Sequence, residues 1–192
     1  MPCLLSLTER LLFNLTASCV PEYSCDCKSN VQMIFSTATC CIIISDLPKA
    51  CFLNGMKLLT PGSLYLLIAD SALGVVWRLN HLTSRYEIAL ESPLMQPPTG
   101  PILLGINRIH VFHSFVYFTN SFQKLFARVP VYLHGPDAGS ATGDYEIVAN
   151  NEFSDDYTFD KEGNAYITQD PGNCPSRSDF HDSLSSSPAL SI

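Results

Sequence analysis

The chain repeats itself at an interval of about 50 residues, and this repeat limits its fold more than any other feature. Residues 105–121 read GINRIHVFHSFVYFTNS, and residues 53–71 share their layout: a small polar pair, an apolar segment, a turn and a further apolar or aromatic run. A shorter copy covers residues 154–170. Three landmarks recur in register one interval apart: Asp70 with Asn120, Ser71 with Ser121, and Arg78 with Arg128. A repeat of this length made only of strands is typical of the blades of a β-propeller.

The segments within each copy predict an all-β fold of four-stranded antiparallel blades. Short apolar or aromatic runs end at turn signals such as Pro61-Gly62, and the continuous apolar run 64–70 indicates a strand buried on both faces. We expect strands at 56–59, 64–70, 74–79 and 86–90, then at 106–112, 115–119, 125–131 and 145–149, and finally at 157–159 and 165–168. The third copy stops after its second strand, so the chain holds about two and a half blades.

A propeller of this size is incomplete, because a closed ring has roughly four to eight blades. Each blade buries its faces only against its neighbours, so two sheet faces would be left bare. Two explanations stay open. The chain is a truncated product of a longer gene, which we favour, or it completes itself by oligomerisation through the exposed blade faces. We expect an irregular Cys-rich head over residues 1–45, blades over 46–173 and a disordered Ser-rich tail over 174–192.

The bulk composition argues against some classes of partner. A formal net charge of −7 and an isoelectric point near 5.0 do not suit a nucleic-acid-binding surface, which needs clustered Lys and Arg. No apolar run reaches the about 18 residues of a membrane span, so we expect no membrane partner and favour a cytoplasmic location. A small-molecule substrate is what the family resemblance given below implies.

The cysteines are concentrated in the head of the chain. Seven of the eight fall at or before position 51. A disulfide framework would normally be spread through the domain that it stabilises, and the spacings Cys25-x-Cys27 and Cys40-Cys41 fit no standard zinc pattern. We interpret these cysteines mainly as buried or incidental thiols rather than as metal ligands or disulfides.

The candidate site residues are the polar residues that open the innermost strands. They are Asn54, Asn107, Asp155 and Asp156. In a propeller these strands line the central channel, so we expect their leading side chains to gather at one end of it. Amide and carboxylate oxygens are ligands that Ca²⁺ or another hard divalent cation prefers. The alternative is that these residues only form the turns between blades.

The same motifs resemble those of a known family. The resemblance is carried by 54–55 with 68–71, by 105–107 with 116–121, and by 155–156 with 160–166. The pattern resembles the gluconolactonase/regucalcin (SMP-30-like) six-bladed propellers, and is most similar to a fungal branch found in secondary-metabolite pathways. That branch includes hetero-Diels–Alderases, which join a quinone methide to an alkene. The resemblance covers roughly residues 45 to 173 and neither the head nor the tail.

For the metal-dependent lactonases of this superfamily, the resemblance implies a divalent cation held by a Glu, an Asn and an Asp. Asn107 and Asp155 match the Asn and Asp ligands, and Asn54 matches a polar residue near the substrate. Asp155 or Asp156 would act as general base while the metal polarises a lactone carbonyl. Two departures weaken this reading: Arg108 stands where a Gly is usual, and the segment that would supply the Glu is missing from the chain.

For the cyclases, which we favour, the resemblance implies catalysis without an obligatory metal. The channel would hold two apolar reactants in reactive geometry, and a hydrogen-bond donor would polarise the oxygen of the heterodiene. Aromatic walls could come from Tyr65, Trp77, Phe115, Tyr117 and Phe118, although packing in the blade core is the more common role of such residues. His110 and His113 would lie on opposite faces of a strand, so we interpret them as packing or surface residues.

Overall fold

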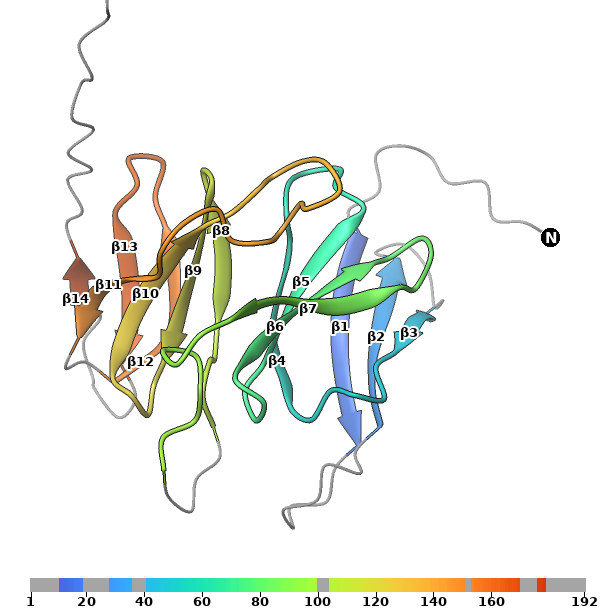
Figure 1. Ribbon diagram of the computed structural model, residues 1–192, viewed down its shortest axis with the longest axis horizontal. Coiled ribbons are helices and arrows are strands. Elements are labelled where there is room, and N and C mark those ends of the chain that lie inside the picture. The colour runs from blue at the N-terminus through green and yellow to red at the C-terminus, as the bar shows by residue number, and fades with distance from the viewer. Residues whose placement is uncertain are drawn as a thin grey trace, which may run out of the picture.

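The chain folds into antiparallel sheets, as the computed structural model shows (Figure 1). The structure describes residues 11–18, 28–35, 41–99, 104–150, 153–169 and 176–178. Within these residues all regular elements are strands. No helix among them has the length and apolar character needed to cross a bilayer.

The strands of the described residues form four sheets. Two sheets have four strands each: β4 (Leu53–Leu58), β5 (Tyr65–Asp70), β6 (Val75–Asn80) and β7 (Tyr86–Glu91), then β8 (Ile109–Phe112), β9 (Phe115–Asn120), β10 (Leu125–Pro130) and β11 (Glu146–Asn150). Two sheets have three strands each: β1 (Leu11–Ser18), β2 (Lys28–Phe35) and β3 (Cys41–Asp46), then β12 (Ser154–Phe159), β13 (Ala165–Gln169) and β14 (Ser176–Ser178). Every sheet follows chain order, so each is a simple up-and-down meander.

The sheets stand side by side like blades (Figure 1). The first strand of each blade lies innermost: β4 contacts both β1 and β8, and β12 contacts β9. We call the row β1, β4, β8 and β12 the inner edge. The predicted all-β fold of four-stranded antiparallel blades in an incomplete ring is confirmed, and the blades predicted from the two longer copies match β4–β7 and β8–β11 closely.

The two ends of the chain differ from expectation. The head, expected to be irregular, contains the three-stranded sheet β1–β3, and β14 falls within the predicted tail. The head strands pair in a regular antiparallel register, with Leu11 opposite Phe35 and Ser18 opposite Lys28. The apolar runs 33–35 and 41–44 are strand-like in sequence, but the head was assigned to no blade because it carries none of the polar landmarks of the repeat. The domain boundaries at 45 and 173 stay predictions.

One cysteine corrects the interpretation of the head. Cys51 is disulfide-bonded, so the expectation of incidental thiols is wrong for this residue. The remaining seven cysteines lie outside the residues whose side chains are described. Cys51 lies two residues before the start of β4.

Apolar side chains fill the spaces on both sides of the blades. Successive residues of a strand point to opposite faces, and along β5 both faces are buried. Leu66 and Ile68 pack in one core cluster, whereas Leu67 and Ala69 pack with residues of β8–β11 in another. A third cluster around Tyr157 joins β8–β11 to β12–β14. This arrangement explains why the β5 segment is continuously apolar rather than alternating.

Asp70, one of the repeat landmarks, is a fully buried carboxylate that ties strands together. It accepts hydrogen bonds from the backbone N–H groups of Cys51 (2.7 Å) and Phe52 (2.9 Å) and from Nε1 of Trp77 (3.1 Å). These donors come from the segment that enters β4 and from β6. The side chain therefore fixes the entry of the blade to its second and third strands.

Asn120 occupies the matching place in the next blade with reversed polarity. Its Nδ2 donates to the carbonyl oxygens of Leu94 (3.1 Å) and Gln96 (2.9 Å), which lie in the linker between the blades. An amide can donate where a carboxylate can only accept. The two blades therefore carry different residues at this position because Asp70 has to accept from N–H groups, whereas Asn120 has to donate to C=O groups.

The positive-φ residue after β5 and after β9 offers a second comparison between copies. Gly74 (φ 65°) and Lys124 (φ 54°) hold matching positions and share the left-handed conformation. A Cβ on Gly74 would come within 2.6 Å of the Cα of Gln96, whereas Lys124 already carries its side chain there. The left-handed region costs a non-glycine residue roughly 1–2 kcal/mol.

Replacing Asp70 with alanine is expected to lower the free energy of unfolding by about 3 kcal/mol, because it leaves buried N–H groups without an acceptor. Urea unfolding followed by near-UV circular dichroism measures the change. Asp144 is exposed, and Asp144→Ala is the control, expected within about 0.5 kcal/mol of the parent. Equal unfolding midpoints for the two variants would contradict the anchoring role of Asp70.

Replacing Lys124 with glycine is expected to raise the free energy of unfolding by about 0.5 kcal/mol, since the strain relieved outweighs the extra chain entropy of glycine. The mirror change Gly74→Ala is expected to lower it by about 2 kcal/mol through strain and overlap with Gln96. The same unfolding experiment measures both. Shifts of the same sign in the two variants would show that the two positions are not equivalent.

Candidate functional site

Three of the predicted site residues meet at the inner edge. Asn54 donates from Nδ2 to Oδ1 of Asn107 at 2.6 Å, and Asn107 donates from Nδ2 to Oδ1 of Asp155 at 2.7 Å. We call these three residues the polar row. They come from β4, from the segment just before β8, and from β12, so one chain of hydrogen bonds crosses three blades. The convergence expected from the repeat is present, while the catalytic and metal-binding roles of these residues stay predictions.

Two serines hold the polar row in place. Nδ2 of Asn54 lies 3.3 Å from Oγ of Ser71, and Nδ2 of Asn107 lies 3.3 Å from Oγ of Ser121. Each serine also donates to a backbone carbonyl of the next blade, Ser71 to Ile106 and Ser121 to Ser154, the latter at 2.6 Å. The serine that recurs in the repeat therefore links neighbouring blades through a backbone carbonyl and also contacts the polar row. The alternative that Asn and Asp serve the blade junctions is consistent with these bonds.

Asp156, the fourth predicted residue, lies apart from the row and pairs with Arg108. Oδ2 of Asp156 is 3.4 Å from Nε of Arg108, and both side chains are nearly half exposed, at 46% and 45%. Oδ1 of Asp156 accepts the N–H of Tyr157 at 2.8 Å. The ion pair joins β12 to the segment that leads into β8.

His110 is a further polar residue of the inner edge, and its ring contacts agree with the packing role expected for it. Its ring packs 5.0 Å from the ring of Tyr157. Burial is the main cause that lowers the pKa of His110 below 6.5, the charge of Lys57 lowers it further, and Asp156 acts in the opposite direction. Lys57 and His110 hold the same place in their copies, three residues after Asn54 and Asn107, which is the sequence signal that could have identified them.

The donor set around Asn107 and Asp155 does not fit the expected divalent cation. Oδ1 of Asn107 already accepts from Asn54, and Asp156 is paired with Arg108. Among the described residues no three His, Cys, Asp or Glu side chains are grouped to hold a metal. Ca²⁺ takes roughly six to eight oxygen ligands, more than this corner offers. The positive charge of Arg108 beside these acidic residues would also repel a bound cation.

The aromatic residues proposed as channel walls are mostly blade core. Trp77, Tyr117 and Phe118 are buried in the clusters between sheets. Tyr65 and Phe115 lie beneath the guanidinium groups of the third strands of their blades, at 5.0 and 4.5 Å. Packing, the more common role weighed for these residues, is what their contacts indicate.

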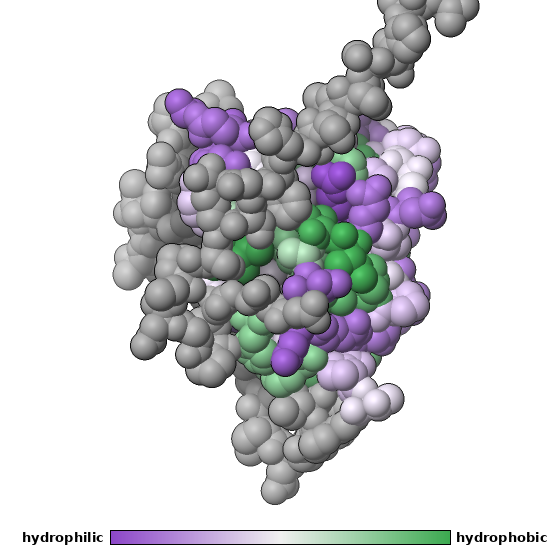
Figure 2. Space-filling model, turned by 90° about the vertical axis from the view of Figure 1, so that its left-hand side faces the viewer, coloured by the Kyte–Doolittle hydropathy of each residue, from purple (hydrophilic) through white to green (hydrophobic). Residues whose placement is uncertain are grey.

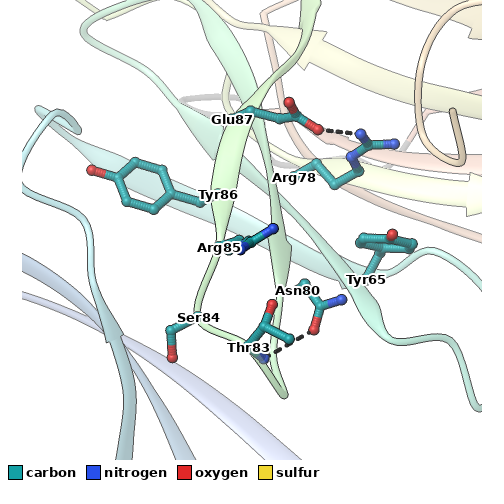
Figure 3. Close-up of a pocket in the computed structure, with 8 residues that line it drawn as sticks. All are labelled: Tyr65, Arg78, Asn80, Thr83, Ser84, Arg85, Tyr86 and Glu87. Atoms are coloured by element: carbon teal, nitrogen blue, oxygen red, sulfur yellow. Dashed lines mark hydrogen bonds and ion pairs between the residues drawn. The ribbon is translucent and has the colours of Figure 1, made fainter. Parts of the chain in front are cut away.

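A cavity of about 660 Å³ lies at the opposite end of β5–β7 from the polar row (Figure 3). It is lined by Tyr65, Arg78, Asn80, Thr83, Ser84, Arg85, Tyr86 and Glu87. Its polar groups are largely used within the fold: Arg78 pairs with Glu87 and donates to the carbonyl oxygen of Pro136 at 3.0 Å, and Asn80 accepts from Thr83. The hydrogen bonds of Arg78 attach the long β10–β11 loop to the preceding blade. The polar residues that line the cavity therefore have mainly structural roles.

The pKa of His110 offers a test of the inner-edge electrostatics. Lys57→Gln is expected to raise this pKa, because a repelling charge is lost, and Asp156→Asn is expected to lower it further, because an attracting charge is lost. Titration of the imidazole signals by NMR measures both. The parent value should lie below 6.5, so stability decreases as the pH falls below 6.5 and the imidazole is forced to charge. Shifts of the same sign in both variants would contradict the assigned geometry.

Comparisons with known proteins extend the structural result. No family model matches the chain, and no curated protein matches its sequence. A chain in the solved structure of a nidogen/laminin complex is similar with a TM-score of 0.59 and 12% identity, over 88% of this chain and 56% of that one. Regucalcin from Agrobacterium tumefaciens, a calcium-binding protein, is similar with a TM-score of 0.50 and 14% identity, over 74% of this chain and 50% of that one. The chain thus spans about half the length of these neighbours, and at such identities the likeness shows the fold alone, a partial β-propeller of the type that includes regucalcin.

Proposed function

We propose that the inner edge is the small-molecule site of a cyclase of the hetero-Diels–Alderase type, acting on a polyketide- or terpene-derived intermediate of fungal secondary metabolism. The observation that carries the proposal is that the two side chains expected to bind a metal are hydrogen-bonded to each other instead, with a hydrogen-bond donor beside them. Asn107 and Asp155 are bonded to each other at 2.7 Å, and Arg108 provides a cation beside them. A cycloaddition needs positioned reactants and a donor rather than a metal-bound water.

The proposed reaction requires no covalent bond between the protein and its substrate. In a hetero-Diels–Alder reaction two σ bonds form as the π electrons of the heterodiene and alkene shift, and no proton, electron or leaving group is transferred. Holding the two reactants together replaces a bimolecular encounter, which is worth up to roughly 7–11 kcal/mol of the barrier. A donor to the heterodiene oxygen adds about 3 kcal/mol when it is aimed at the developing charge.

Arg108 is the side chain best suited to be that donor. It is nearly half exposed, and its side chain makes no hydrogen bond within the described part of the chain. Asp156 orients the guanidinium through Nε, which leaves the terminal nitrogens to point at a ligand. Asn54, Asn107 and Asp155 then act as a rigid wall, fixed by Ser71 and Ser121.

A divalent-metal-dependent lactonase or esterase is the second candidate. It is favoured by the closeness of the Asn107 and Asp155 side chains, the two oxygens that would have to coordinate the ion. The likeness to a calcium-binding regucalcin points the same way at the level of fold. The incomplete donor set and the charge of Arg108 make this the weaker proposal.

A non-catalytic role is the third candidate, because the chain spans only about half of the propellers that it resembles. In Figure 2, apolar residues gather in the middle of the face at the β12–β14 end, with polar residues around them. We propose that such blade faces take part in oligomerisation. Sedimentation equilibrium of the full chain tests this, and a monomer at all concentrations would contradict it.

The test of the cyclase proposal is turnover of an ortho-quinone methide with an alkene, followed by product chirality. The parent chain is expected to give an enriched stereoisomer with or without EDTA, and Arg108→Gln to lose at least about 10-fold in kcat. Arg85→Gln is the control, because Arg85 lines the cavity at the far end of the blade. A rate that requires one equivalent of metal, together with hydrolysis of a lactone, would instead support the second candidate.

A further inference from the structure

Two basic side chains on neighbouring inner strands have charged ends that the fold does not use. The ammonium of Lys57 makes no ion pair or hydrogen bond with any residue that the structure describes, and the side chain is exposed. The guanidinium of Arg108 has one ion pair, through Nε to Asp156 at 3.4 Å. Both charges lower the pKa of His110. Lys57 stands on β4, which contacts β8, and it lies two residues after Gly55, whose backbone is packed against Arg108.

The backbone of β4 packs closely against the segment that leads into β8. Gly55 lies against the segment that carries Arg108, and a Cβ on it would meet the carbonyl oxygen of Asn107 at 2.8 Å and the Cα of Arg108 at 3.1 Å. Such distances exclude any side chain at position 55 without movement of the backbone. At this position β4 therefore presents no side chain beside Arg108.

The ion pair of Arg108 can be exchanged at little cost. Both partners are nearly half exposed, and pairs of this kind contribute about 0–1 kcal/mol. The two arginines of the repeat differ from it. Arg78 is 12% exposed and is held by Glu87 and by carbonyl oxygens of the β10–β11 loop, and Arg128 is bonded to Glu146 at 2.9 Å. Of these three arginines, Arg108 is the one with donors to offer a ligand.

We propose that Arg108 and Lys57 form a binding site for an anionic oxygen group, a carboxylate or an enolate, carried by the small-molecule ligand. The guanidinium matches a carboxylate with two parallel N–H groups, and Lys57 adds a second charge from the adjacent blade. The imidazole of His110 completes the site as a neutral neighbour. Arg108 thus takes the part that a divalent cation has in metal-dependent sites. This inference rests on the proposed function, because it names the substrate class of the same site.

Benzoate is the probe for the site, titrated into the full chain while the imidazole signals of His110 are followed by NMR. The parent is expected to show a saturable shift, and Arg108→Gln and Lys57→Gln are each expected to weaken the apparent affinity by at least about 10-fold, as for the loss of a charge-assisted hydrogen bond. Arg85→Gln should bind as the parent does. Near-UV circular dichroism verifies that each variant is folded.

The outcomes separate this inference from the cyclase proposal. The absence of a saturable shift, or equal affinity in the parent and Arg108→Gln, overturns the anion site. Loss of benzoate binding in EDTA also overturns it, because a metal ion would then hold the carboxylate. Saturable binding that depends on Arg108 but comes without turnover of the quinone methide supports the anion site and refutes the cyclase.

Discussion

Short polar side chains at the ends of β5 and β9 fix the strands within a blade and the junctions between blades, and the remaining structure depends on them. Asp70 is fully buried and satisfies N–H groups at the entry of its own blade, whereas Asn120 satisfies carbonyl groups of the linker before its blade. Apolar packing alone would let the sheets slide, because it has little directionality. Buried polar groups without partners are costly, so these bonds fix one position for each sheet.

The same bonds also position the side chains of the candidate site. Ser71 and Ser121 each donate to the backbone of the next blade and each lie 3.3 Å from the amide nitrogen of Asn54 or Asn107. A side chain that is held from two sides loses little entropy when a ligand arrives. The junction between blades therefore preorganises the polar row for the chemistry proposed for it.

Much of this could be predicted from the repeat, and the rest depended on contacts that a repeat does not encode. The interval of about 50 residues predicted the strands of β4–β11 and the meeting of Asn54, Asn107 and Asp155, because equivalent positions of successive blades face one axis. The head sheet lacked the landmarks, and the disulfide of Cys51 left no signal in its spacing. The pairing of Arg108 with Asp156 arises between positions that differ from copy to copy, so no internal comparison could reveal it.

Those differences between copies are where function is to be sought. Positions that keep their residue type, such as Arg78 and Arg128, are committed to glutamate partners within their own blades. The position after the leading Asn changes from Gly55 to Arg108, and the change adds a charge that no neighbour in the described chain fully uses. A charge beside the polar row would cost solvation if it were buried without a partner, but here it stays nearly half exposed at the inner edge. The terminal donors of Arg108 therefore face solvent, from which the proposed anionic group would approach.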